Sequence, residues 1–298
     1  MIQLRQRRAA CFGKGCKEDN MVNFRTEKVS ENITRIFGIS GELWYLVEGT
    51  QKAALLDTGS GIGRMKPLID SLTDKPLLIL LTHGHVDHAM GATEFDCPIY
   101  MNGADDGIYE AHKPMEMRRE CLGGTPGEIR DLIEDSDFIP FRTRPFLPLH
   151  HGDVFDLGGT TIEAYACVGH TPGSMVFLLR EARTLLLGDA CNFFTFLFFD
   201  YCSPVETYRK NLLVLKDQLS GKVDKILLSH GDGNAPLSII DGVINLCEDI
   251  INGRVDNVPF VFMGESAVVA KATLPNGGRA DGGVGNIVYQ TDHIFEKK

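Results

Sequence analysis

The sequence predicts a layered α/β protein in which buried strands alternate with helices. Short apolar runs such as Pro76–Thr82 have the length and composition of strands that are buried on both faces. Between such runs, segments such as Ile62–Leu72 place apolar residues at the spacing of one helical face. Polar residues that can bind metals follow several of the strands, and strand ends are where layered α/β proteins build their sites. At 298 residues the chain is long enough for a substantial core.

Composition and charge exclude several classes of function. The formal net charge of −10 argues against a nucleic-acid-binding surface spread over the whole protein. No apolar run reaches the roughly 18 to 20 residues that span a bilayer, and the N-terminus lacks the apolar segment of a signal peptide. Eight cysteines scattered through a chain of this length predict reduced thiols. We therefore expect a cytoplasmic protein that binds neither nucleic acid nor a membrane.

The first half of the chain is expected to contain a tail and then a series of strands. Residues 1–22 are basic and show no apolar period, which predicts a tail or peripheral arm ahead of a single domain over residues 23–298. Glycines separate the first strand candidates. The expected strands are Ile33–Ile39, Leu43–Val47, Ala53–Asp57, Pro76–Thr82 and Pro98–Met101. The expected helices are Ile62–Leu72 and Ala104–His112.

Residues 113–150 differ from the rest of the domain. They are charged and rich in proline, glycine and methionine, with a helix expected only at Pro126–Ile133. An irregular segment of this length inside a compact domain is more often a functional lid or insertion than a plain linker. We therefore treat residues 113–150 as a lid-like insertion.

The second half repeats the alternation and ends in short strands. Its expected strands are Val154–Leu157, Thr161–Ala166, Met175–Leu179, Thr184–Leu187 and Asp224–Ser229. A helix is expected from Ser203-Pro204, as N-cap and first turn, to about Leu219, and another from about Pro236 to Asn252. Residues 256–298 are expected to form a C-terminal extension of short strands, at Val261–Met263, Ala267–Ala270 and Asn286–Tyr289.

The strand at Pro76–Thr82 is followed at once by a cluster of potential metal ligands. They are His83, His85, Asp87 and His88. Imidazole and carboxylate groups bind borderline divalent cations such as Zn²⁺. The alternative is a solvated polar turn, but such turns are usually built from serine, asparagine, aspartate and proline. The pattern therefore favours a metal site at the end of this strand.

Three further candidates occupy the same kind of position. His170, Asp189 and His230 each follow an expected strand of the second half. Taken singly, a histidine or aspartate after a strand is usually a turn or cap residue. Together with the first cluster they supply five histidines and two aspartates, which is enough to hold two metal ions.

The order of these motifs resembles the metallo-β-lactamase-fold hydrolase superfamily over roughly residues 33–252. The motifs are His-x-His-x-Asp-His at 83–88, Gly-His-Thr-Pro-Gly-Ser at 169–174, Gly-Asp at 188–189 and Ser-His-Gly at 229–231. The resemblance implies a four-layer αββα sandwich with the site at one edge, between the sheets. It also implies that His83, His85 and His170 hold one metal, that Asp87, His88 and His230 hold the second, and that Asp189 bridges both. Asp57 matches the family position whose carboxylate orients ligand histidines.

The expected chemistry is metal-dependent hydrolysis. Two cations about 3.5 to 4 Å apart can share a water and lower its pKa toward roughly 7, so that the bridging hydroxide attacks an electrophilic carbonyl. Asp87 is expected to orient that hydroxide or to pass a proton to the leaving atom, and Asp189 to bridge the metals. We expect two divalent ions, zinc first, although the same ligands accept iron and manganese.

Differences from particular subfamilies limit which branch of the superfamily this chain resembles. The main zinc β-lactamases carry a cysteine ligand where this chain has Asp189, and related nucleases need basic surfaces that this acidic chain lacks. The glyoxalase II-like and lactonase-like branch shares all seven ligands. Lactonases, however, place a tyrosine near the position of Asn192, so that role is absent or falls to Tyr201.

The run Phe193–Phe199, which includes Phe194, gives the clearest indication of a substrate. This run is consistent with a buried strand, with an apolar wall of the pocket or with a dimer interface. The last of these would make the protein a homo-oligomer. We expect Asn192, Phe193, Phe194 and Tyr201 to contact a small, partly apolar ester, thioester or lactone. Phosphodiester hydrolysis is the alternative, with amide hydrolysis or non-catalytic binding less favoured. The insertion also carries basic residues, which are read first as solvated charges and otherwise as contacts for a substrate carboxylate or phosphate. They are Lys113, Arg118, Arg119, Arg142 and Arg144.

Overall fold

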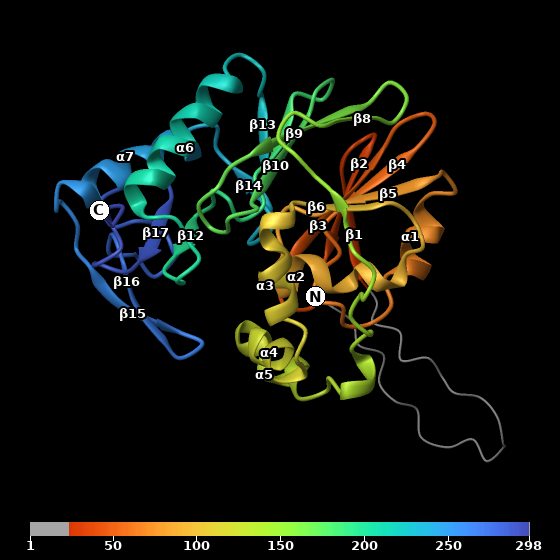
Figure 1. Ribbon diagram of the computed structural model, residues 1–298, viewed down its shortest axis with the longest axis horizontal. Helices are drawn as coiled ribbons and strands as arrows, with labels where there is room; N and C mark the ends of the chain where they lie inside the picture. Colours follow the sequence, from red (N-terminus) through yellow and green to blue (C-terminus); the bar gives the residue numbers. More distant parts are fainter. Residues whose placement is uncertain (1–23, 298) are drawn as a thin grey trace.

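The apolar runs of the sequence form two sheets that lie face to face between layers of helices in the computed structural model, which describes residues 24–297 (Figure 1). The first sheet has the strand order β1-β2-β3-β4-β5-β6-β7. Its strands are β1 (Arg25–Ser30), β2 (Ile33–Phe37), β3 (Leu43–Glu48), β4 (Ala53–Leu56), β5 (Leu77–Leu80), β6 (Ile99–Met101) and β7 (Leu147–Pro148). Neighbouring strands are antiparallel from β1 to β4 and parallel from β4 to β7.

The second sheet has the order β14-β13-β11-β10-β9-β8. Its strands are β8 (Val154–Asp156), β9 (Thr161–Ala166), β10 (Met175–Leu179), β11 (Thr184–Leu186), β13 (Lys225–Leu227) and β14 (Asn234–Ala235). The pair β11 and β13 is parallel, whereas the other neighbours are antiparallel. Because β5, β9, β11 and β13 each precede a candidate ligand, the two sheets together carry all the predicted motifs.

Three apolar clusters hold the layers together. Tyr45 of the first sheet and Phe177 of the second are fully buried between the two sheets. Ile69 packs on the outer face of the first sheet, and Tyr208 packs on the outer face of the second. The helices involved are α1 (Lys66–Leu72), α2 (Val86–Ala89), α6 (Val205–Gln218) and α7 (Ile239–Ile251). This packing confirms the predicted αββα order.

A third sheet in the described chain joins the segment after Asp189 to the C-terminal strands. Its order is β12-β17-β16-β15, with β12 at Phe194–Leu197, β15 at Val258–Phe262, β16 at Glu265–Val269 and β17 at Asn286–Tyr289. Strand β12 runs parallel to β17, and the other pairs are antiparallel. Phe196 and Phe198 pack against Phe260 and Phe262 in this sheet. The predicted strands after residue 256 are therefore present, shifted by up to three residues at their starts.

Residues 103–137 are built mainly from short helices, and an irregular stretch leads from them to β7. They include α3 (Asp106–Ala111), α4 (Met115–Glu120) and α5 (Gly127–Arg130), with 3-10 turns at Gly103–Asp105, Cys121–Gly124 and Asp135–Asp137. The helix expected at Pro126–Ile133 is thus shorter, and α4 was not expected. Arg118 of α4 is buried and donates to the carbonyl oxygens of Ser60, Gly61 and Ile139. Its guanidinium anchors the segment to the loop after β4, so Arg118 is neither a solvated charge nor a contact for a substrate anion, and both expectations are wrong for this residue.

The remaining outcomes concern single elements, the cysteines and the chain's N-terminal arm. Strand β1 was not expected, because its residues are mostly exposed and polar and its backbone pairs only with β2 at the sheet edge. Helix α6 begins after Pro204, which is the N-cap residue in place of the expected Ser203. Cysteines among residues 24–297 are free thiols, whereas the predicted arm at residues 1–22 lies outside the described residues. No helix within residues 24–297 is both long and apolar enough to cross a membrane.

Candidate metal centre

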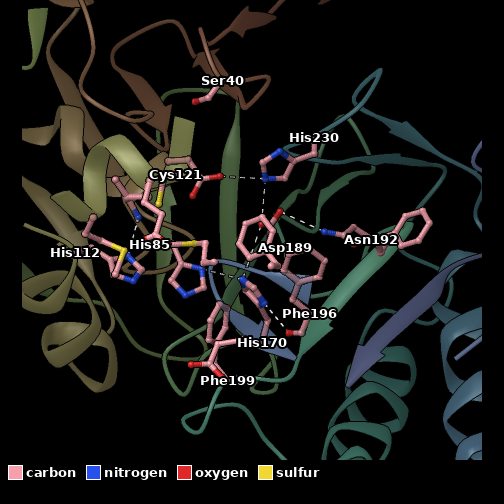
Figure 2. Close-up of a pocket in the computed structure, with 18 of the residues that line it drawn as sticks. Ser40, His85, His112, Cys121, His170, Asp189, Asn192, Phe196, Phe199 and His230 are labelled. Atoms are coloured by element: carbon pink, nitrogen blue, oxygen red, sulfur yellow. Dashed lines mark hydrogen bonds and ion pairs between the residues drawn. The ribbon is translucent and has the colours of Figure 1, made fainter. Parts of the chain in front are cut away.

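Side chains that follow the ends of four strands converge at one edge of the paired sheets. The loop after β5 carries His83 and His85 and leads into α2, whose first turn carries Asp87 and His88. The loops after β9, β11 and β13 carry the remaining three candidates, which are His170, Asp189 and His230. Figure 2 shows His85, His170, Asp189 and His230 pointing toward one another across a cavity. The structure thus brings together all seven residues that the sequence nominated.

The seven side chains form two adjacent groups, each of which could hold a metal ion. In the first group, His83 Nε2 and His170 Nε2 each lie 3.0 Å from His85 Nδ1. All three imidazoles are buried. Three ring nitrogens at this separation cannot all carry protons, and a cation between them would bind the free lone pairs.

The outer nitrogens of the three histidines contact fixed oxygen atoms. His83 Nδ1 lies 2.9 Å from Thr82 Oγ1, and His170 Nδ1 lies 2.9 Å from the carbonyl oxygen of Phe196. His85 Nε2 lies 2.8 Å from the Tyr201 hydroxyl oxygen. A ring N–H that donates outward leaves the other nitrogen free to bind a metal, so these contacts favour the required tautomers. The proton positions are inferred from this network.

The second group contains Asp87, His88, Asp189 and His230. Asp189 Oδ2 lies 3.1 Å from His230 Nε2 and 3.4 Å from His88 Nε2. Asp87 Oδ2 lies 3.4 Å from His230 Nε2 and 3.6 Å from His88 Nε2. The same Asp189 oxygen is 3.9 Å from His170 Nε2 of the first group. Asp189 therefore lies between the two groups, where a bridging carboxylate would be.

Asp57 forms hydrogen bonds with both ends of the segment that follows β5. Its Oδ2 accepts a hydrogen bond from His88 Nδ1 at 2.8 Å, and its Oδ1 accepts one from the Thr82 backbone N–H at 2.7 Å. The residue is fully buried and has a φ of 66°, a left-handed conformation that aspartate tolerates better than most residues. The carboxylate is thus placed to hold His88 with Nε2 facing the second group.

The second group fits a divalent cation. His88 Nε2 is buried and has no hydrogen-bond partner among the described residues, although it faces two carboxylates. An unpartnered buried nitrogen costs free energy unless it binds something. Imidazole nitrogens and carboxylate oxygens are ligands for Zn²⁺, and iron and manganese accept the same set.

The pKa shifts of the histidines differ between the two candidate groups. Burial, together with the neighbouring imidazoles, lowers the pKa of His83 and His85 well below the usual value. Burial also opposes protonation of His88, but the carboxylates of Asp87, Asp57 and Asp189 raise its pKa well above the usual value. Desolvation likewise opposes protonation of His230, yet Asp189 raises its pKa to about 9. The carboxylates of the second group therefore attract positive charge, which a metal ion would supply in place of protons.

Asp105 is a buried residue of the centre that the sequence analysis missed. Its carboxylate accepts hydrogen bonds from Gly84 N–H at 2.9 Å, Thr171 Oγ1 at 2.7 Å and Gly173 N–H at 2.6 Å. It thereby joins the loop of His85 to the loop of His170. Asp105 follows strand β6 after three intervening residues, so a search for polar residues shortly after predicted strands could have found it.

His112 packs against the first group without joining it. Its ring stacks on that of His85, with centroids 5.1 Å apart and planes at 27°. Its Nδ1 accepts a hydrogen bond from the Val86 N–H at 3.1 Å, at the start of α2. His112 thus supports both the His85 ring and the helix that carries Asp87 and His88. No spacing in the sequence indicated this contact.

A cavity of about 680 Å³ opens beside the two groups. All four residues expected to contact substrate line it, and they are Asn192, Phe193, Phe194 and Tyr201. Asn192 Nδ2 also donates to Asp189 Oδ1 at 3.4 Å. Further apolar lining comes from α4 and the third sheet, with Met117, Phe196, Phe199, Phe262 and Met263. A pocket of this size with a few convergent polar groups suits a small molecule with an apolar portion.

Replacing Tyr201 with phenylalanine is expected to weaken metal binding at the three-histidine group by about tenfold, because His85 would lose the acceptor of its Nε2 proton. The measurement is a metal titration in competition with a chromogenic chelator. Tyr100→Phe, which removes a hydroxyl outside the cavity, is the matched control. Equal affinity in the two variants would show that Tyr201 does not position His85.

One family model matches most of this chain, and curated relatives match parts of it. A family model described as the metallo-beta-lactamase superfamily matches residues 38–230. An uncharacterised protein of Mycobacterium tuberculosis is 31% identical over 135 residues, which are 44% of this chain and 56% of that protein, so the match spans about half of the relative. The acyl-coenzyme A thioesterase MBLAC2 of Gallus gallus is 26% identical over 65% of this chain and 73% of its own length.

Solved structures show the same fold at low sequence identity. A metallo-beta-lactamase from Pontibacter korlensis superposes with a TM-score of 0.54. The two chains are 16% identical, and the match covers 75% of this chain and 98% of the other. At this level of identity the likeness concerns the fold alone.

Proposed function

Because this chain belongs to the metallo-beta-lactamase superfamily, we propose that it is a binuclear metal-dependent hydrolase of acyl thioesters with an apolar acyl group. The observation that carries the proposal is the position of the cavity, whose aromatic wall adjoins both candidate metal groups. An acyl chain against that wall would place its carbonyl carbon beside the ligand residues. Membership of the glyoxalase II-like or lactonase-like branch stays a prediction. The preference for thioesters is supported instead by a named relative and by the lining of the cavity.

The proposed centre holds two divalent cations, with zinc expected. His83, His85 and His170 would hold one, Asp87, His88 and His230 the other, and Asp189 would touch both. When bound, such cations supply Lewis acidity, which polarises a carbonyl group and lowers the pKa of water toward about 7.

The residues of the chain would have distinct tasks in the reaction. In thioester hydrolysis the carbonyl carbon gains a bond to a water oxygen and loses its bond to sulfur, while a proton from the water ends on the departing sulfur. Asp87 is the proposed carrier of that proton, because its carboxylate lines the cavity and is partly exposed. Phe194 and Phe196 would hold the acyl group and exclude water from it.

Two observations favour a thioester over a phosphodiester. One relative, 73% of whose length is covered by the match, is named an acyl-coenzyme A thioesterase. The cavity is lined largely by apolar side chains, and no lysine or arginine is among the described residues that line it. A phosphodiester would bring negative charge to a wall that offers no cation from the protein.

A substrate panel tests the proposal. Zinc-loaded protein is mixed with a decanoyl thioester, the matching acetyl thioester, decanoyl homoserine lactone, a β-lactam and bis-p-nitrophenyl phosphate, and the initial rates are compared. We expect the decanoyl thioester to show the highest kcat/KM, and acetyl thioester to fall by about tenfold or more, because each buried methylene contributes about 0.8 kcal/mol. A higher kcat/KM for the lactone or the phosphodiester would contradict the proposal.

A further inference from the structure

We infer that the cavity selects thioesters with an uncharged leaving group and disfavours those whose thiol carries phosphates. This inference rests on the proposed function and concerns the part of the substrate that leaves. It follows from which segments form the mouth of the cavity and from the charges that those segments carry.

Two chain segments distant in sequence complete the cavity opposite the metal loops. Helix α4 contributes Met117 and Glu120, and the third sheet contributes Phe262, Met263 and Glu265. Within these segments the apolar side chains are partly buried, whereas both glutamates are exposed. The apolar side chains of these two segments are therefore less exposed than the two carboxylates, which lie where the cavity opens to solvent.

The charge of this mouth is negative. Glu120 ends α4 and Glu265 begins β16, and among the described ion pairs neither carboxylate has a cationic partner. The neighbouring cations of the same segment are engaged elsewhere, since Lys113 pairs with Glu110 and Arg119 pairs with Asp135. No lysine or arginine lies among the described residues that line the cavity.

A substrate that enters acyl chain first leaves its thiol portion at this mouth. The aromatic wall would take the acyl group, and the carbonyl must reach the ligand residues beside it. The thiol portion would then lie near Glu120 and Glu265. Like charges repel over about 10 Å at ordinary ionic strength, so a phosphorylated thiol would meet repulsion that a neutral one avoids.

Two substrates with the same acyl group test the inference. Decanoyl-N-acetylcysteamine has a neutral leaving group, and decanoyl-coenzyme A has a phosphorylated one. At low ionic strength we expect kcat/KM to favour the neutral thioester by about tenfold, mainly through KM. About 0.5 M sodium chloride is expected to reduce the ratio, because salt screens the exposed carboxylates.

Charge reversal assigns the effect to the two residues. Glu120→Lys and Glu265→Lys should each raise kcat/KM for the coenzyme A thioester by about threefold relative to kcat/KM for the neutral thioester measured on the same variant. Glu116→Lys is the matched control, because this exposed residue belongs to α4 but does not line the cavity. A control variant that changes the ratio as much as the other two would overturn the assignment.

The outcomes separate this inference from the proposed function. If both thioesters are hydrolysed with equal kcat/KM and charge reversal has no effect, the thioesterase proposal stands and the leaving-group inference is wrong. If neither thioester is hydrolysed by metal-loaded protein, both are wrong. A preference for the neutral thioester that salt and both reversals reduce supports the two together.

Discussion

The Asp189→Ala variant is expected to lose about a thousandfold or more in kcat/KM and to bind fewer than two metal ions per chain. One Asp189 oxygen lies 3.1 Å from His230 Nε2, 3.4 Å from His88 Nε2 and 3.9 Å from His170 Nε2. The side chain therefore contacts both candidate groups, and its removal would take a ligand from each metal. Because the remaining imidazoles stay in place, metal affinity should fall without loss of the fold.

Metal content by mass spectrometry and steady-state kinetics test this expectation. Circular dichroism should show the same secondary structure in the variant, so that lost activity reports the centre and not unfolding. Asp200→Ala is the control, since Asp200 is exposed on the same segment and does not line the cavity. Full activity in Asp189→Ala would show that the proposed site is wrong.

The Asp57→Asn variant should weaken both the second metal site and the fold. In the native protein one carboxylate oxygen accepts from His88 Nδ1 and the other accepts from the Thr82 N–H. An asparagine side chain must turn its NH₂ group toward one of these donors. Donor would then face donor, which costs about 1–3 kcal/mol of stability in a buried position. If the NH₂ group faces His88, the ring would be driven toward the tautomer whose Nε2 carries the proton and cannot bind a metal.

Chemical denaturation and metal competition measure the two effects separately. Metal affinity should fall by about 10- to 100-fold, the usual cost of losing a group that orients a ligand histidine. Asparagine tolerates the left-handed conformation of residue 57, so backbone strain should not contribute. Asp70→Asn removes an exposed carboxylate paired with Lys66 and should change neither quantity much. Unchanged affinity in Asp57→Asn would contradict the orienting role.

The parts of the structure that could be predicted from the sequence are those with local signals. Buried strands such as β5 and β10 consist of consecutive apolar residues, and the ligand residues follow strand ends. In the first sheet, β5 belongs to the parallel part. In the second sheet, β11 and β13 are parallel, and β9 runs in the same direction as β11 because both are antiparallel to β10, so the ends of β9, β11 and β13 point the same way. Local pattern and general topology rules were therefore sufficient to nominate the seven side chains.

Features that depend on contacts between distant segments could not be predicted. Strand β1 has mostly exposed side chains and is held by its backbone pairing to β2. The burial of Arg118 depends on carbonyl groups in the loop after β4, which no charge pattern indicates. Asp105 lies shortly after β6 and Tyr201 was expected to contact substrate, but their hydrogen bonds with the ligand loops appear only once the chain is folded.

The pairing of β12 with β17 has a consequence for how the cavity arises during synthesis. Strand β12 carries aromatic residues that line the cavity, yet its hydrogen-bonded neighbour is formed by residues far later in the chain. Contacts of such high sequence separation form slowly, because the intervening chain must first be ordered. The loops that carry the candidate ligands are therefore synthesised before the aromatic strand of the cavity has its partner strand. A ribosome-bound chain that stops short of residue 286 would carry all seven candidate ligands beside an uncovered aromatic strand.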